Sequence, residues 1–210
     1  MDNLKKPLSI KIIYWFTNIT FWIYISVSVV TFAFVAALFI FNTETLELHV
    51  GVPVVVNILE TGTLDLNIVS NYVDVEFVEM TGKVHFHKTP PEVAKVYALF
   101  IFIIFILSIY IFVIFRRFIN NVYSGNYFDY KNISLLKRIS YTLVIIWLFT
   151  VFYGYFQYFF LVINMKFNTI ELTSDVKTYP IILLVALIIW VLSHIFAVGS
   201  KLEEENKLIV

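Results

Sequence analysis

The chain has 210 residues, of which 60% are hydrophobic, 19% aromatic and only 14% charged, and its formal net charge is zero. A soluble domain is normally about 45–50% apolar and about 25% charged, so this composition indicates a membrane protein. The neutral charge argues against direct nucleic-acid binding, and the lack of cysteine excludes disulfides and thiolate metal sites.

Four apolar runs dominate the sequence. They extend over residues 12–41, 93–115, 139–163 and 179–198. Each reaches or approaches the roughly 20 helical residues that cross about 30 Å of hydrocarbon. The first run is about twice as long as the apolar part of a cleaved signal peptide, so we expect it to remain as a membrane helix. The runs predict a membrane all-α fold, a bundle of four transmembrane helices.

Lysine and arginine are distributed unevenly between the segments that flank these runs. Ten of them fall in the N-terminal flank, between the second and third runs, and in the tail: Lys5, Lys6, Lys11, Arg116, Arg117, Lys131, Lys137, Arg138, Lys201 and Lys207. The other segments hold five: Lys83, Lys88, Lys95, Lys166 and Lys177. Because basic residues near the membrane stay on the cytoplasmic side, both termini are predicted to be cytoplasmic. The expected location is the bacterial cytoplasmic (inner) membrane, which the chain crosses several times.

Residues 1–41 contain the N-terminal flank and first helix, and the next segment, 42–92, has a period of two. Apolar and polar residues alternate in four stretches, at 46–50, 64–68, 73–77 and 83–87. Three dipeptides provide turn signals, namely Thr61-Gly62, Ser70-Asn71 and Thr81-Gly82. Such alternation is typical of half-buried strands. The segment is therefore predicted to form a small extracytoplasmic antiparallel β-sheet of four or five strands, inserted between the first two helices.

The remaining membrane helices occupy residues 93–198 together with a predicted cytoplasmic loop, 116–138. Within that loop, Ser124-Gly125-Asn126 has the composition of a turn. Asp129 or Asn132 has the side chain of an N-cap for a helix that enters the third run. The cytoplasmic tail, 199–210, is predicted to continue the fourth helix.

Residues for chemistry are few. His85 and His87 are two apart in a predicted strand and, with His49, are weak candidates for a zinc-type site. Lys83 would share their face and repel a cation, so a solvated sheet face is the preferred interpretation and no metal or cofactor is expected. The sequence has no G-x-S-x-G motif and no phosphate-cradling glycine loop, which predicts a protein that is not an enzyme and has no catalytic residues.

Two cytoplasmic stretches carry a family resemblance. The first is Gly125-Asn126-Tyr127-Phe128, followed by Asn132 and by the entry Leu136-Lys137-Arg138-Ile139, and the second is the whole tail from Gly199. Together they resemble an uncharacterised bacterial family of four-helix integral membrane proteins, domain of unknown function 2975. That family has a G-x-x-F turn after its second span, and its chains end with a glycine, a leucine, acidic residues and a short hydrophobic terminus. The family usually has an acidic residue in place of Lys207 and a threonine in place of Ile209.

The resemblance implies a function through partners. The family has no established enzymatic activity, and its members are often encoded beside a small helix-turn-helix regulator, which implies that they sequester or modulate a cytoplasmic transcription factor. The partner-contact candidates lie in the two motif stretches: Gly125, Phe128, Lys137, Arg138, Gly199, Leu202, Glu204 and Glu205.

The sequence therefore favours a non-enzymatic membrane protein of regulatory or sensory type, with the lipid bilayer and a cytoplasmic regulatory protein as partners. Two alternatives remain open at this stage: a small-molecule transporter or channel element, and an accessory subunit of a membrane complex. Transport is the less favoured, because carriers usually hold ionisable groups within their spans and these runs have almost none. The sequence does not specify the oligomeric state.

Overall fold

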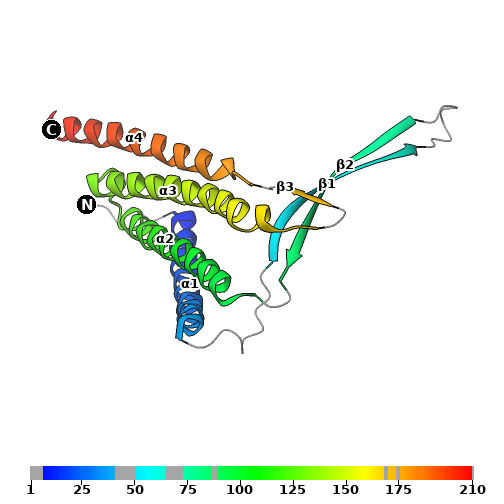
Figure 1. The fold of residues 1–210 in the computed structure, drawn as a ribbon. Coiled ribbons are helices and arrows are strands. Elements are labelled where there is room, and N and C mark those ends of the chain that lie inside the picture. The colour runs from blue at the N-terminus through cyan, green and yellow to red at the C-terminus, as the bar shows by residue number, and fades with distance from the viewer. Residues whose placement is uncertain are drawn as a thin grey trace. The chain divides into compact units, whose positions relative to one another are not determined.

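The computed structural model describes residues 7–40, 51–64, 73–86, 89–167, 170–173 and 176–209. Figure 1 shows their elements in chain order: α1 (Leu8–Ile40), β1 (Gly51–Leu64), β2 (Val73–His85), α2 (Pro91–Tyr123), α3 (Tyr130–Phe160), the 3-10 turn η2 (Val162–Asn164), β3 (Glu171–Thr173) and α4 (Pro180–Ile209). They form two compact units. A helical unit contains α1, α4, α2 from Lys95 onward and α3 as far as Phe149, and a sheet unit contains the strands and the last turns of α3.

All four long helices of the described chain have the length and apolar composition of membrane spans. They exceed the roughly 20 residues that a span needs, and this confirms the prediction of a multi-pass protein with four spanning helices. The helices also extend past the apolar runs. The helix α2 continues through Arg116-Arg117 to Tyr123. Arginine is a good helix former, so the helix does not have to end where the apolar run ends.

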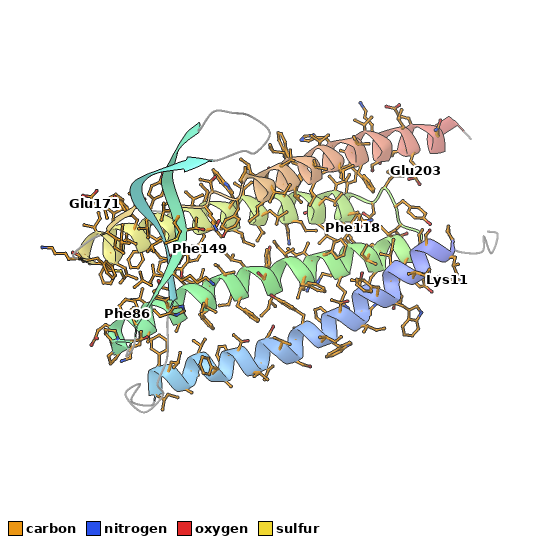
Figure 2. All side chains as sticks on the ribbon, turned by 90° about the vertical axis from the view of Figure 1, so that its right-hand side faces the viewer. Lys11, Phe86, Phe118, Phe149, Glu171 and Glu203 are labelled. Carbon is orange, nitrogen blue, oxygen red and sulfur yellow. The ribbon has the colours of Figure 1, made fainter. Side chains whose placement is uncertain are left out.

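In the helical unit, α1 and α2 pack against each other through aromatic rings. Tyr14, near the start of α1, stacks on Tyr123 at the end of α2 with ring centroids 4.1 Å apart. Phe32, near the end of α1, contacts Phe102 in the first half of α2 at 5.5 Å. The two helices are therefore antiparallel, and Figure 2 shows their side chains along the shared length.

A polar contact reinforces the same pair of helices. The Arg116 Nε donates to Asn18 Oδ1 at 2.8 Å, and the guanidinium lies 4.2 Å from the ring centroid of Phe21. A cation over an aromatic face gains electrostatic energy, more so where water is excluded. The half-buried Arg116 thus has three partners on α1, since its guanidinium also lies 5.9 Å from the ring centroid of Trp22.

The contact between α3 and α4 depends on small residues. Ala186, Ser193 and Ser200 are buried on α4 and recur every seven residues, which places them along one face. Ser140 of α3 donates its hydroxyl hydrogen to the carbonyl oxygen of Ala186 at 2.8 Å. Small side chains allow two helix backbones to approach closely in a bilayer, where burial from water does not drive association. Small residues therefore set the contact surface of α4.

The sheet has strand order β2-β1-β3, and both pairings are antiparallel. The insertion between α1 and α2 supplies a long β1–β2 hairpin, as expected, but the third strand comes from the segment between α3 and α4. The described residues of 42–92 form two strands, β1 and β2, and the prediction of separate strands at 73–77 and 83–87 is wrong, because the described part of both lies in β2. The expected strand at 46–50, residues 65–68 of the expected strand at 64–68, and the turn at Ser70-Asn71 lie outside the described residues.

The predicted turns at Thr61-Gly62 and Thr81-Gly82 are also wrong. Gly62 pairs with Val75, and Gly82 pairs with Val54, so both dipeptides lie inside the β1–β2 ladder. A glycine inside a strand costs conformational entropy but blocks no backbone hydrogen bond, and the long pairing compensates for that cost. The register instead shifts between Asn57 and Glu60, where the ladder is irregular.

The connection between α2 and α3 is short and closed by local hydrogen bonds. The Asn126 N–H donates to the carbonyl of Asn121 at 3.1 Å, and the Gly125 N–H to that of Val122 at 3.1 Å. Gly125 has a φ of 92°. This is a Schellman motif, in which a left-handed glycine ends the helix. Asp129 then accepts a hydrogen bond from the Lys131 N–H at 3.0 Å, which confirms it as the N-cap of α3.

The Gly125→Ala substitution tests the turn. A Cβ at Gly125 would meet no atom within 4 Å, so the cost comes from the left-handed backbone alone, about 1–2 kcal/mol. We expect the melting temperature in detergent to fall by about 2–4 °C per kcal/mol. Gly82→Ala is the matched control, since its Cβ also meets nothing within 4 Å and its φ is not left-handed. An equal loss in both variants would contradict this explanation.

Candidate partner-binding site

Asn132 organises the connection between α2 and α3. It is 0% exposed, and its Nδ2 donates to the carbonyl oxygens of Asn126 and Tyr127. Its Oδ1 accepts from the Nδ2 of Asn121 on α2 at 2.8 Å. Both the amide group and the carbonyl group of this buried side chain are therefore paired. The sequence offered Asp129 and Asn132 as candidate N-caps of α3. Asp129 is the cap, whereas the side chain of Asn132 links the α2–α3 connection to both helices through its hydrogen bonds.

Phe128 then lies against a glycine of α4. A Cβ built on Gly199 would come within 2.7 Å of Phe128 Cε1, closer than real Cβ atoms approach other atoms. The Phe128 ring also contacts Phe196, one helical turn earlier on α4, at 5.5 Å between centroids. Gly199 therefore provides the space that the aromatic ring occupies. Phe128 of the first motif stretch and Gly199 of the second therefore meet in one contact.

A pocket of about 440 Å³ opens beside this contact. Its lining comes from both motif stretches: Gly125, Asn126, Tyr127, Phe128, Asp129, Tyr130, Ser200, Glu203 and Glu204. In Figure 2, the labelled Glu203 lies on the end of α4 beside the α2–α3 connection. Segments more than 70 residues apart in the sequence thus form one surface feature of the helical unit.

The pocket combines aromatic rings with carboxylates. Tyr127 is 42% exposed and Tyr130 is 66% exposed, so both rings are available to a partner. Asp129, Glu203 and Glu204 contribute the acidic groups. Tyrosine is enriched in protein–protein interfaces because it offers a large apolar ring with a polar end. This chemistry suits a basic protein surface better than an anion.

The structure brings together some of the predicted partner-contact residues. Gly125, Phe128 and Glu204 line the pocket, and Gly199 lies directly under the Phe128 ring. Other candidates lie elsewhere: Leu202 and Glu205 are exposed on other faces of α4, Arg138 lines a different pocket, and the half-buried Lys137 lines neither of these two pockets. Within the tail, Glu205 lies 3.9 Å from Lys201 instead.

Six residues of the pocket lining are not among the predicted partner-contact residues: Asn126, Tyr127, Asp129, Tyr130, Ser200 and Glu203. A signal for part of the set was present. Phe196, Gly199 or Ser200, and Glu203 or Glu204 follow one another at three or four residues, so they share one face of a continuous α4. With the helical period continued through the tail, Glu203 and Glu204 lie on the same face of α4 as Phe196 and Ser200. Glu205 lies on a different face.

The weak metal candidates are not assembled in the described part of the chain. His85 ends β2 with an exposed side chain and packs over Gly51, whose built Cβ would lie 3.1 Å from the imidazole. His49 and His87 lie outside the described residues. Among the residues that are described, no group of three potential His, Asp or Glu ligands occurs.

A further pocket of about 300 Å³ lies between α1 and α2. Its lining is apolar throughout: Phe32, Val35, Ala36, Phe39, Leu99 and Phe102. Such a lining offers no ligand to an ion and no hydrogen bond to a polar substrate. This pocket therefore does not favour the transporter alternative.

Four candidate spanning helices define a multi-pass membrane protein, and the pocket described above lies on its helical unit. The chain belongs to the family of proteins of unknown function DUF2975, whose family model matches residues 66–210. The match includes α2, α3, α4 and both motif stretches, and it begins after α1. No curated protein and no solved structure matches the chain.

The contact between Phe128 and Gly199 is testable by a double-mutant cycle. Gly199→Ala adds a Cβ that must displace the Phe128 ring, so we expect it to lower the melting temperature of the native chain. In a Phe128→Ala background the space is free, and the same substitution should stabilise α4 by up to about 1 kcal/mol. The coupling energy should be about 0.5–3 kcal/mol. The same effect in both backgrounds would mean that the two residues do not interact.

Proposed function

We propose that this protein is a non-enzymatic regulator in the cytoplasmic membrane that holds a cytoplasmic protein at the pocket between the α2–α3 connection and the end of α4. The observation that carries the proposal is the convergence of the two motif stretches on that one pocket. The contact of Phe128 with Gly199 fixes the two motif stretches relative to each other, so the surface that a partner would bind is already formed. Preformed surfaces lose less entropy on binding.

The lining residues support binding rather than chemistry. The Asp129 carboxylate already caps α3, and Ser200 is buried on α4. The charged groups of the lining are the carboxylates of Asp129, Glu203 and Glu204, and they lie beside aromatic rings. Exposed tyrosines and carboxylates are instead the groups with which a protein surface recognises a basic partner.

The partner that fits best is a small DNA-binding regulator. Such proteins carry a basic face for phosphates, and Glu203 and Glu204 present the opposite charge. Binding to this pocket would cover the face that DNA needs and so sequester the regulator. The same partner is implied by the family resemblance, in which a helix-turn-helix regulator is often encoded nearby. We expect the complex to weaken as ionic strength rises, because exposed charges are screened.

The orientation follows from the basic residues. Arg116, Arg117, Lys131 and Arg138 all lie at the end of the helical unit that carries the pocket, and positive charges favour the cytoplasmic side. In this arrangement both termini are cytoplasmic and the β1–β2 hairpin is extracytoplasmic. The hairpin would then be placed to receive an external signal.

Single cysteines test this topology on a background that contains none. Ser124→Cys places a thiol in the exposed turn after α2, and Met80→Cys places one on the exposed surface of β2. We expect a membrane-impermeant maleimide to label Met80→Cys in intact cells and Ser124→Cys only after permeabilisation. The reverse pattern would invert the orientation, and equal labelling of both would argue that α2 does not cross the membrane.

Site-specific photocrosslinking in native membranes tests the docking role. A photoreactive residue at Tyr127 should give an adduct with a protein that mass spectrometry identifies as a DNA-binding regulator. The same residue at Tyr141, which is exposed on α3 away from the pocket, should not give that adduct. Truncation after Gly199 should abolish it, because the truncation removes Ser200, Glu203 and Glu204.

A charge reversal provides the matched control. Glu204→Lys lines the pocket with a like charge toward a basic partner, which should lower the adduct yield by about tenfold or more. Glu205→Lys makes the same change one residue further, outside the pocket, and should leave the yield close to that of the native chain. An unchanged yield after truncation, or equal losses for the two reversals, would overturn the docking role.

A further inference from the structure

A second pocket, of about 320 Å³, lies between the end of α2 and the start of α3 and is rich in cations. Arg117 and Asn121 line it from α2, and Lys131, Ser134, Leu135 and Arg138 line it from α3. The α3 residues occupy positions i, i+3, i+4 and i+7, so they form one continuous face of that helix. Three positive side chains from two helices therefore converge on one concave surface.

These cations have no acidic partner among the residues that the structure describes. Among the described residues, no carboxylate lies within 4.0 Å of Arg117, Lys131 or Arg138. The acid nearest in sequence, Asp129, lines the other pocket and accepts the backbone N–H of Lys131. The neighbouring Arg116 differs, since its guanidinium is held by Asn18 and Phe21 of α1. Close, unneutralised positive charges repel one another, and a bound anion would remove that repulsion.

The position of the pocket indicates the source of the anion. The apolar run of α2 ends at Phe115, two residues before Arg117, and the apolar run of α3 begins directly after Arg138. Lys131 lies seven residues earlier on α3, which is about 10 Å along the axis. Arg117 and Arg138 thus lie where the hydrocarbon of a bilayer ends, and Lys131 lies at headgroup depth or just beyond it.

We propose that this pocket binds the phosphate of an anionic phospholipid headgroup. Arg117 and Arg138 donate to the phosphate oxygens, Lys131 neutralises the remaining charge, and the Ser134 hydroxyl offers one more donor. Leu135 contributes the apolar part of the lining. Basic pockets between membrane helices are a recurring mode of lipid recognition. The inference is independent of the proposed protein partner, because it concerns different residues and holds for either orientation.

Native mass spectrometry of the full chain in detergent tests the proposal, with phosphatidylglycerol and phosphatidylcholine as the added lipids. The native chain should retain phosphatidylglycerol in preference to phosphatidylcholine. Neutralising one cation, as in Arg138→Gln, should weaken that binding about fivefold, and Arg117→Gln/Lys131→Gln/Arg138→Gln should abolish the preference. Lys11→Gln is the control, since this exposed lysine lies on α1 at the same end of the unit but outside the pocket (Figure 2).

The outcomes separate the possible explanations. Equal retention of the two lipids by the native chain, or unchanged retention by the triple variant, would overturn the proposal. Equal losses for Lys11→Gln and Arg138→Gln would indicate a general effect of positive charge and would also overturn it. Displacement of the lipid by an equal concentration of inorganic phosphate would assign the pocket to a soluble anion. If the triple variant does not fold, the single variants decide, because each changes one exposed side chain.

Discussion

The fully buried side chain of Asn132 is the constraint on which the functional end of the helical unit depends. A buried carboxamide is costly unless its hydrogen-bonding groups are paired, and here they are paired with the backbone of the α2–α3 connection and with Asn121. These bonds hold Asn126 and Tyr127 against the start of α3. The ring of the next residue, Phe128, therefore lies against Gly199 of α4, and the pocket lies beside that contact.

The same connection separates two surfaces of opposite charge. Successive residues of a helix point about 100° apart, so Asp129 and Tyr130 line the aromatic and acidic pocket, whereas Lys131 and Arg138 line the basic one. A phosphate would be repelled from the first pocket and attracted to the second. The two proposed ligands, a protein at the acidic pocket and an anionic lipid at the basic one, would therefore not compete for the short α2–α3 connection.

The helical unit uses two kinds of packing to hold this connection in place. The antiparallel pair α1 and α2 meets through rings and through the guanidinium of Arg116, whereas α3 meets α4 at the hydrogen bond from Ser140 to the carbonyl oxygen of Ala186, which lies on a face of small buried residues. Within a bilayer, close packing and hydrogen bonds must stabilise the contact between helices, because burial from water does not contribute there as it does in a soluble protein. The small residues bring α4 close to α3, and this close approach brings its last turns to Phe128.

The sequence by itself determined the four spanning helices, because the bilayer requires about 20 apolar residues for each. It also determined the turn at Gly125, which depends on local hydrogen bonds, and it limited the cap of α3 to Asp129 or Asn132, between which the structure decides for Asp129. Local patterns predicted turns at Thr61-Gly62 and Thr81-Gly82, but both dipeptides lie inside paired strands. The pairing of β1 with β2 therefore outweighs the local turn signal. Only the tertiary structure decided that the α2–α3 connection and the end of α4 share a pocket, because the space over Gly199 that admits Phe128 exists only when α3 and α4 pack.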